Sequence, residues 1–190
     1  MTTLIPPDYA AWLAELKTTI RTARLKAGLA VNRELVLLYW RIGKEILERQ
    51  SAQGWGAKVI DQPARDLRAE FSDMRGFSRT NLLYMRAFAS AWPEEAIVHQ
   101  LGGQIPWRHN CVIIDQVKDR ATREWYIRKT IENGWSRSVL ELQIETAAHR
   151  RVGASQTNFD RALPSPQSDL ARDILKDPYT FDFLGITDAS

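Results

Sequence analysis

The sequence predicts an all-α protein of about seven helices, with two helix-turn-helix-like units and an extended C-terminal tail. Gly, Pro, Ser and Asn residues cut the 190-residue chain into pieces of helical length. Within these pieces apolar residues recur at spacings of three and four, which is typical of amphipathic helices. Apolar residues make up 44% of the chain and charged residues 26%, so it has enough apolar material for a core, and global disorder is excluded.

Two helices are expected in the first 53 residues, packed as an antiparallel pair. The first begins after Pro7 and ends at Gly28, with Trp12, Leu16 and Ile20 at helical spacing. The second spans about residues 31–53 and has a broad apolar face opposite a charged one.

Helices also account for most of the middle of the chain. One is expected over about residues 57–71, where Pro63 predicts either a kink or a later start near Gln62. Ser78 is a good N-cap for the next helix, which Trp92-Pro93 ends. Residues 94–105 fit either a helical turn or a short strand. Further helices are expected over about residues 106–118, 121–132 and 137–151, with Asn133-Gly134 as the signal that ends the second of them and Ser136 as the N-cap of the third.

The last part of the chain has a different composition, so we predict a helical domain over residues 1–151 followed by a linker and tail over residues 152–190. A short helix is expected over about residues 167–175. Beyond it Tyr179, Phe181 and Phe183 alternate with other residues, which predicts a strand with one aromatic face. Such a strip needs a cover: its own helical body, a second copy, or a partner. We expect self-association, and hence a homo-oligomer.

The net charge of +3 is divided unevenly along the chain. Residues 1–151 carry 23 Lys and Arg against 17 Asp and Glu, whereas residues 152–190 carry 3 against 6. Most of the basic residues are Arg, which binds phosphate well. A modestly basic body suits a polyanionic partner, although a solvated surface with extra Arg has the same composition.

Several classes of protein are excluded by what the sequence lacks. No apolar run approaches the ~18 residues of a membrane span, and no secretory signal is visible. The single Cys111 makes neither a disulfide framework nor a zinc site. No spacing typical of metal ligands, phosphate loops or nucleophile elbows occurs. We therefore expect a cytoplasmic protein without membrane contact, metal or cofactor.

A seven-residue motif occurs twice. Residues 76–82 read Gly-Phe-Ser-Arg-Thr-Asn-Leu, and residues 134–140 read Gly-Trp-Ser-Arg-Ser-Val-Leu. Each copy follows one amphipathic helix and opens another, which is the outline of a helix-turn-helix unit. The start of the second helix in such a unit contacts base edges and phosphates. A capped helix without a DNA role has the same outline, and Glu141 and Glu145 make the second copy the poorer DNA surface.

The motif predicts a double-stranded DNA interface centred on its first copy. Arg and Asn there suit guanine and adenine edges, and nearby arginines suit phosphates. His109 stands at another helix start, where a capping or core-edge role is the commoner alternative. The predicted DNA-binding residues are Arg75, Ser78, Arg79, Thr80, Asn81, Tyr84, Arg86, Arg108, His109 and Arg137. Arginines 75, 79, 86 and 108 on one shared face would favour DNA binding, and arginines scattered around the body would favour protein docking.

Glu15-Leu16-Lys17 spells half of a nuclease metal site. Such a site needs its Glu and Lys on a strand beside an Asp from a neighbouring strand. On a helix, residues two apart do not face the same way. We therefore predict no catalytic residues in this chain.

Several stretches of rare residues resemble, in family order, the N-terminal domain of the YhcG family of PD-(D/E)xK nuclease-superfamily proteins, a bacterial family. The matching stretches cover nearly the whole chain: Tyr39-Trp40-Arg41-Ile42-Gly43-Lys44, Trp55-Gly56, Gly76-Phe77-Ser78 with Asn81-Leu82 and Met85-Arg86, Gln104-Ile105-Pro106-Trp107 with His109, Tyr126, Glu132-Asn133-Gly134-Trp135-Ser136, and residues 176–184.

The resemblance implies a DNA-associated protein linked to bacterial defence and mobile elements. In the family, the segment like residues 176–184 leads into a C-terminal domain that carries the Asp and E-x-K residues. This chain ends at Ser190, so we expect the DNA-binding, targeting or docking half of such a nuclease, whose tail contacts a nuclease domain or a partner protein. The alternative is a helical oligomerisation or protein-interaction domain.

Overall fold

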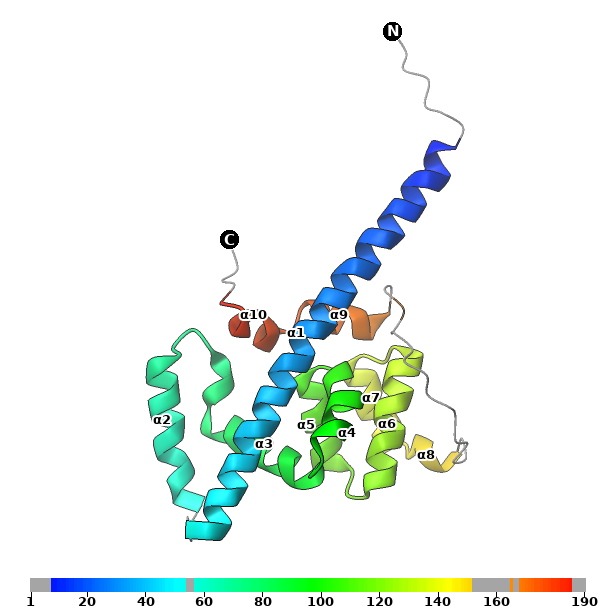
Figure 1. Cartoon of the computed structure of the whole chain (residues 1–190). Coiled ribbons are helices and arrows are strands. Elements are labelled where there is room, and N and C mark those ends of the chain that lie inside the picture. Colours follow the sequence, from blue (N-terminus) through cyan, green and yellow to red (C-terminus); the bar gives the residue numbers. More distant parts are fainter. Residues whose placement is uncertain (1–7, 54–56, 152–164, 166–167, 186–190) are drawn as a thin grey trace.

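The computed structural model describes residues 8–53, 57–151, 165 and 168–185, and every regular element in these residues is helical (Figure 1). The all-α prediction is confirmed. The elements are α1 (Tyr9–Gln53), η1 (Ala57–Ile60), α2 (Asp61–Glu70), η2 (Arg75–Phe77), α3 (Arg79–Ala91), α4 (Glu95–Gln100), η3 (Gly102–Gln104), α5 (Trp107–Gln116), α6 (Arg120–Asn133), α7 (Arg137–Glu145), α8 (Ala148–Arg151), α9 (Asp169–Leu175) and α10 (Pro178–Phe183). None of these helices is long and apolar enough to cross a membrane.

The first 53 residues form one long helix, so the predicted antiparallel pair is wrong. Helix α1 runs 45 residues without a break, and its N-terminal end projects beyond the rest of the described chain (Figure 1). Gly28 lies inside it, where a Cβ would be 3.1 Å from the Leu175 side chain and 3.3 Å from that of Ile174. Gly28 therefore admits α9 to the surface of α1 and does not end the helix.

The core is centred on the crossing of α1 with α3. The backbones approach so closely that a Cβ on Gly43 would lie 2.0 Å from the Met85 carbonyl oxygen. Trp107 of α5 fills the space beside the crossing, with edge-to-face ring contacts at 4.9 Å to Tyr39 and 5.3 Å to Phe88. All of these aromatic rings are buried, and together they fix the position of α5 against the α1–α3 pair.

Local signals place the helix ends as predicted at several points. Pro63 falls in the first turn of α2, where its missing N–H costs nothing, so the later start is correct. Ser78 and Ser136 cap α3 and α7 by accepting from the N–H groups of Asn81 and Val139. Gly134 ends α6 in the left-handed conformation at φ 65°. The stretch that fitted either helix or strand contains α4.

The tail is helical, so the predicted strand over residues 179–184 is wrong. Asp177 caps α10 by accepting from the Tyr179 N–H at 3.0 Å, and Pro178 occupies its first turn. This places Tyr179 and Phe183 one turn apart, and both pack on the core of the same chain. The predicted linker over residues 152–164 lies outside the described residues.

Candidate nucleic-acid interface

Two adjoining cavities form a groove beside α3, α5 and α7. One has a volume of about 370 Å³ and the other about 260 Å³, and both are lined by Arg108 and Arg137. The smaller cavity is bounded by Ser78 and Thr80 from the first copy of the motif, by Arg137 from the second copy, and by Glu141, which directly follows the second copy. The fold thus brings the two copies, 58 positions apart in the sequence, to one groove.

The groove collects the N-terminal turns of three helices. Helices α3, α5 and α7 begin at Arg79, Trp107 and Arg137, and residues from all three first turns line its smaller cavity. Helix N-termini carry partial positive charge and free N–H groups, which favour anions. The N-terminus of α7 has such an anionic group bound to it, since the Arg137 N–H donates to the Asp173 carboxylate at 3.2 Å.

Arg108, Arg137 and Lys176 supply exposed cationic side chains of the groove, and the two guanidiniums line both of its cavities. The Arg108 guanidinium lies 5.5 Å from the ring centroid of Tyr179, a cation–π contact that holds the side chain over α10. Arg137 Nε is 3.6 Å from the Glu141 carboxylate, a weak pair between two partly exposed groups. Both guanidiniums keep donors free for a further anion, since each has five N–H groups.

Asn81 does not face outward as predicted but is buried, with 5% of its surface exposed. Its amide donates to the Gly76 carbonyl at 2.6 Å and accepts from Trp107 Nε1 at 2.7 Å. Asn81 therefore ties the motif turn to α5 and is unavailable to a base. The signal for this was the repeat itself, since the same motif position holds the apolar Val139 in the second copy.

His109 is also buried, with 1% exposed, at the edge of the core, which is the commoner of the two roles considered for it from the sequence. Its Nε2 lies 3.3 Å from the Trp135 carbonyl oxygen and 3.6 Å from the Asp173 carboxylate. Burial lowers the His109 pKa to about 4, against the opposing effect of Asp173, so the ring is neutral at pH 7.

Three predicted arginines form contacts outside the lining of the groove. Arg79 pairs with Asp61 of α2 at 2.6 Å, and Arg75 Nε lies 3.7 Å from Asp182 of α10. Arg86 donates to Gln50 of α1 at 3.4 Å. The groove therefore unites Arg108 with Arg137 but not with these three. Arginines 75, 79, 86 and 108 are thus not gathered at this groove, which by the criterion set from the sequence favours the protein-docking alternative.

Tyr84 and Thr80, two of the predicted DNA-binding residues, line the smaller cavity of the groove. The Tyr84 hydroxyl donates to the Asp115 carboxylate at 2.5 Å, and this hydrogen bond raises the Tyr84 pKa to about 12. Thr80 is exposed in the first turn of α3. These two side chains offer hydroxyl groups beside the cationic centre.

Sequence reasoning missed the contribution of the tail to the groove. Asp173, Lys176 and Asp177 all line the larger cavity, although they were assigned to the chain's tail. Asp177 is 5% exposed, and burial raises its pKa to about 6. The helix over about residues 167–175 was predicted, but the aromatic alternation that follows it indicated a strand in a tail separate from the helical domain, so no contact with the groove was expected.

An apolar cavity of about 810 Å³ lies on another part of the molecule, between α1, α2 and α10, and none of the predicted DNA-binding residues lines it. Within the described residues no group of three or more His, Cys, Asp or Glu is placed to hold a metal ion. Glu15 and Lys17 are exposed on α1, about 200° apart around a helix.

The architecture is that of an all-α domain with a mixed-charge groove at three helix starts. The DUF1016 N-terminal domain matches residues 15–151, and the chain belongs to this family. It is also similar to the Escherichia coli (strain K12) protein named "Putative nuclease YhcG", with 24% identity over 204 residues. The match covers 89% of this chain and 54% of that protein, so the chain spans about half the length of its relative. No solved structure matches the chain.

Proposed function

We propose that this chain is the DNA-binding part of a YhcG-type nuclease and that its groove contacts the phosphate backbone of duplex DNA. The observation that carries the proposal is the placement of two exposed guanidiniums, those of Arg108 and Arg137, at three converging helix N-termini. The hydrogen bond from the Arg137 N–H to the Asp173 carboxylate supports the proposal, because it shows that the N-terminal end of α7 binds an anionic oxygen.

The contacts of the base-reading candidates favour weakly specific binding. Asn81 is committed to Gly76 and Trp107, and Arg79 to Asp61. The acidic Asp115 and Glu141 confine the cationic surface to a small area. Phosphate contacts position a protein on DNA without reading its sequence, so affinity should vary little between duplexes.

A salt-titrated binding assay on a labelled duplex tests the proposal. Arg108→Gln together with Arg137→Gln should weaken binding, and each lost phosphate contact should reduce the salt slope by about 0.9. Arg68→Gln on α2, an exposed arginine outside the groove, is the matched control and should change neither. Arg79→Gln should also have little effect, which distinguishes the groove from the first motif copy alone. Binding that is independent of salt, or equal in the double variant and the control, would contradict the proposal.

We also propose that this chain has no catalytic site, and that the part of a full-length relative beyond the match supplies cleavage in the cytoplasm. With Mg²⁺ or Mn²⁺ present, the purified chain should leave duplex DNA intact. Cleavage that disappears in Glu15→Gln would show instead that the E-x-K sequence is functional.

A further inference from the structure

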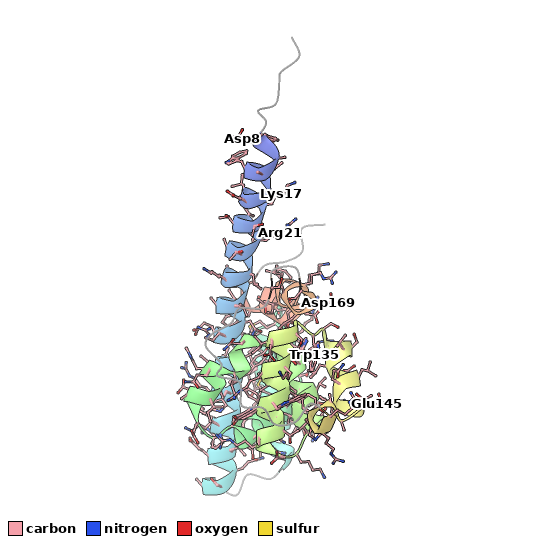
Figure 2. The ribbon with its side chains drawn as sticks, turned by 90° about the vertical axis from the view of Figure 1, so that its right-hand side faces the viewer. Asp8, Lys17, Arg21, Trp135, Glu145 and Asp169 are labelled. Atoms are coloured by element: carbon pink, nitrogen blue, oxygen red, sulfur yellow. The ribbon has the colours of Figure 1, made fainter. Side chains whose placement is uncertain are left out.

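The N-terminal part of α1, residues 9–24, projects from the body as a single helix (Figures 1 and 2). We call these residues the arm. In Figure 2, Lys17 and Arg21 lie on the arm well clear of the other helices. The first buried residue along the helix is Leu25, with 1% of its surface exposed. An isolated helix of about this length is marginal in water, so the arm gains stability if it packs against something.

The arm carries an apolar stripe. Four large side chains remain exposed along it: Tyr9 at 40%, Trp12 at 54%, Leu16 at 39% and Ile20 at 51%. Three of them, Tyr9, Leu16 and Ile20, fall in one series with smaller or less exposed residues. The series is Tyr9, Leu13, Leu16, Ile20, Ala23 and Ala27, in which steps of four and three alternate. This is the heptad spacing of a two-helix seam, with Trp12 on its flank.

The stripe faces away from the surface that α1 packs on the body. Leu16 and Leu25 are nine residues apart, as are Ile20 and Leu29, and nine residues make about two and a half helical turns. Leu25 and Leu29 are buried and point toward the body. The stripe is therefore on the opposite side of the helix and is not an extension of the body's core.

From this geometry we infer that the arm pairs with the arm of a second copy, in parallel, as a short coiled coil. At their exposed fractions the four large side chains leave roughly 370 Å² uncovered per chain, taking ~200 Å² for each. Two copies would bury up to roughly 740 Å² from these side chains, and Leu13, Ala23 and Ala27 of both copies add to this area, which brings the total close to the ~1,000 Å² that a specific interface needs.

The charges on the flanks of the seam favour the parallel orientation. One flank carries Lys17 and Arg24, and the other carries Trp12, Thr19 and, at the end nearest the body, Lys26. In an antiparallel pair like flanks meet, so the basic flanks would repel one another. In a parallel pair opposite flanks meet five positions apart, which sets Lys17 near Trp12 and Arg24 near Thr19 of the second copy. The first of these pairs suits a cation–π contact.

Solution mass tests the pairing. The full chain should have twice its monomer mass in light scattering after size exclusion, and Ile20→Glu should halve that mass. Thr18→Glu is the matched control, because Thr18 is exposed on the arm away from the seam and should leave the dimer intact. The urea midpoint of the body should be similar in both variants, which excludes loss of folding as the cause. A monomeric parent chain, or a dimer that survives Ile20→Glu, overturns the pairing.

A disulfide test settles the orientation. In a Cys111→Ser background, Ala23→Cys places one thiol at a seam position near the body. Parallel arms bring the two thiols together, so mild oxidation should link nearly all of the dimer. A dimer that does not cross-link, but links when Ala23→Cys chains are mixed with Leu13→Cys chains, would establish antiparallel arms and overturn the parallel assignment.

Discussion

Two buried groups beside the groove should respond to acid in opposite directions. Burial lowers the pKa of His109 from 6.5 to about 4, and burial raises the pKa of Asp177 from 3.8 to about 6. Both side chains line the same cavity and are almost fully buried. Because the two pKa shifts change the free energy of unfolding in opposite directions as the pH falls, their effects largely cancel in the parent chain. Substituting one group at a time should make each effect measurable.

The magnitudes follow from proton linkage. His109 has its lower pKa in the folded state, so its contribution to stability is present above pH 6.5 and is lost as the pH falls toward 4. Between about pH 7.5 and 5.0 this loss is about 2 kcal/mol. Asp177 has its higher pKa in the folded state, so its contribution is fully present below pH 3.8 and is lost as the pH rises through 6. Acidification over the same interval restores about 1.5 kcal/mol.

Urea unfolding followed by tryptophan fluorescence at the two pH values measures these contributions. His109→Gln keeps a donor for the Trp135 carbonyl and should become about 1.5–2 kcal/mol more stable on acidification, relative to the parent. Asp177→Asn keeps a cap for the Tyr179 N–H and should lose about 1.5 kcal/mol relative to the parent. Other carboxyl groups titrate in all three proteins and cancel in the comparison. Two variants that both follow the parent would refute the assignment of these groups as buried titrating sites.

Three further changes test the packing. Gly43→Ala should lower the free energy of unfolding by roughly 3 kcal/mol in urea denaturation, because the added Cβ would lie 2.0 Å from the Met85 carbonyl oxygen. Gly28→Ala, whose Cβ would contact only side chains, should change it by no more than about 1 kcal/mol. Equal effects of the two substitutions would contradict the close crossing of α1 and α3. Asn81→Ala should cost about 2–4 kcal/mol in the same assay by leaving Trp107 and Gly76 unpaired, and a neutral result would argue against its burial. Ser78→Ala should cost about 1 kcal/mol as a lost cap, seen as a lower midpoint.

The sequence was informative where a local interaction decides the conformation. The caps Ser78 and Ser136 and the helix end at Gly134 were predicted correctly, and of the two alternatives left open at Pro63 the later helix start is the one observed. Each is determined by hydrogen bonds or dihedral limits within one turn of the residue. Helix starts are therefore the most predictable part of this fold.

Predictions failed where a distant contact decides. Gly28 signalled a helix end, but its small size serves the approach of α9 from the other end of the chain. The two glycines that open the repeated motif are also needed for different reasons. Gly134 has a positive φ, which is set locally, whereas Gly76 leaves space for the distant Tyr39 hydroxyl, from which a Cβ would be 2.1 Å away. Asn81 was assigned to DNA because its partner Trp107 lies 26 positions away. Residue type alone does not distinguish these uses.

The parallel arms and the groove together make a prediction about DNA binding. Parallel arms place both bodies at the same end of the seam, so we expect one duplex to contact the grooves of both copies. Ile20→Glu leaves the groove unchanged but separates the copies. At equal chain concentration it should weaken DNA binding and reduce the salt slope to about half, because about half as many phosphates are contacted per complex. Thr18→Glu adds the same charge on the opposite side of the arm and should retain the parent slope. If Ile20→Glu is monomeric but binds with the parent slope, each groove acts alone and the arm has another role.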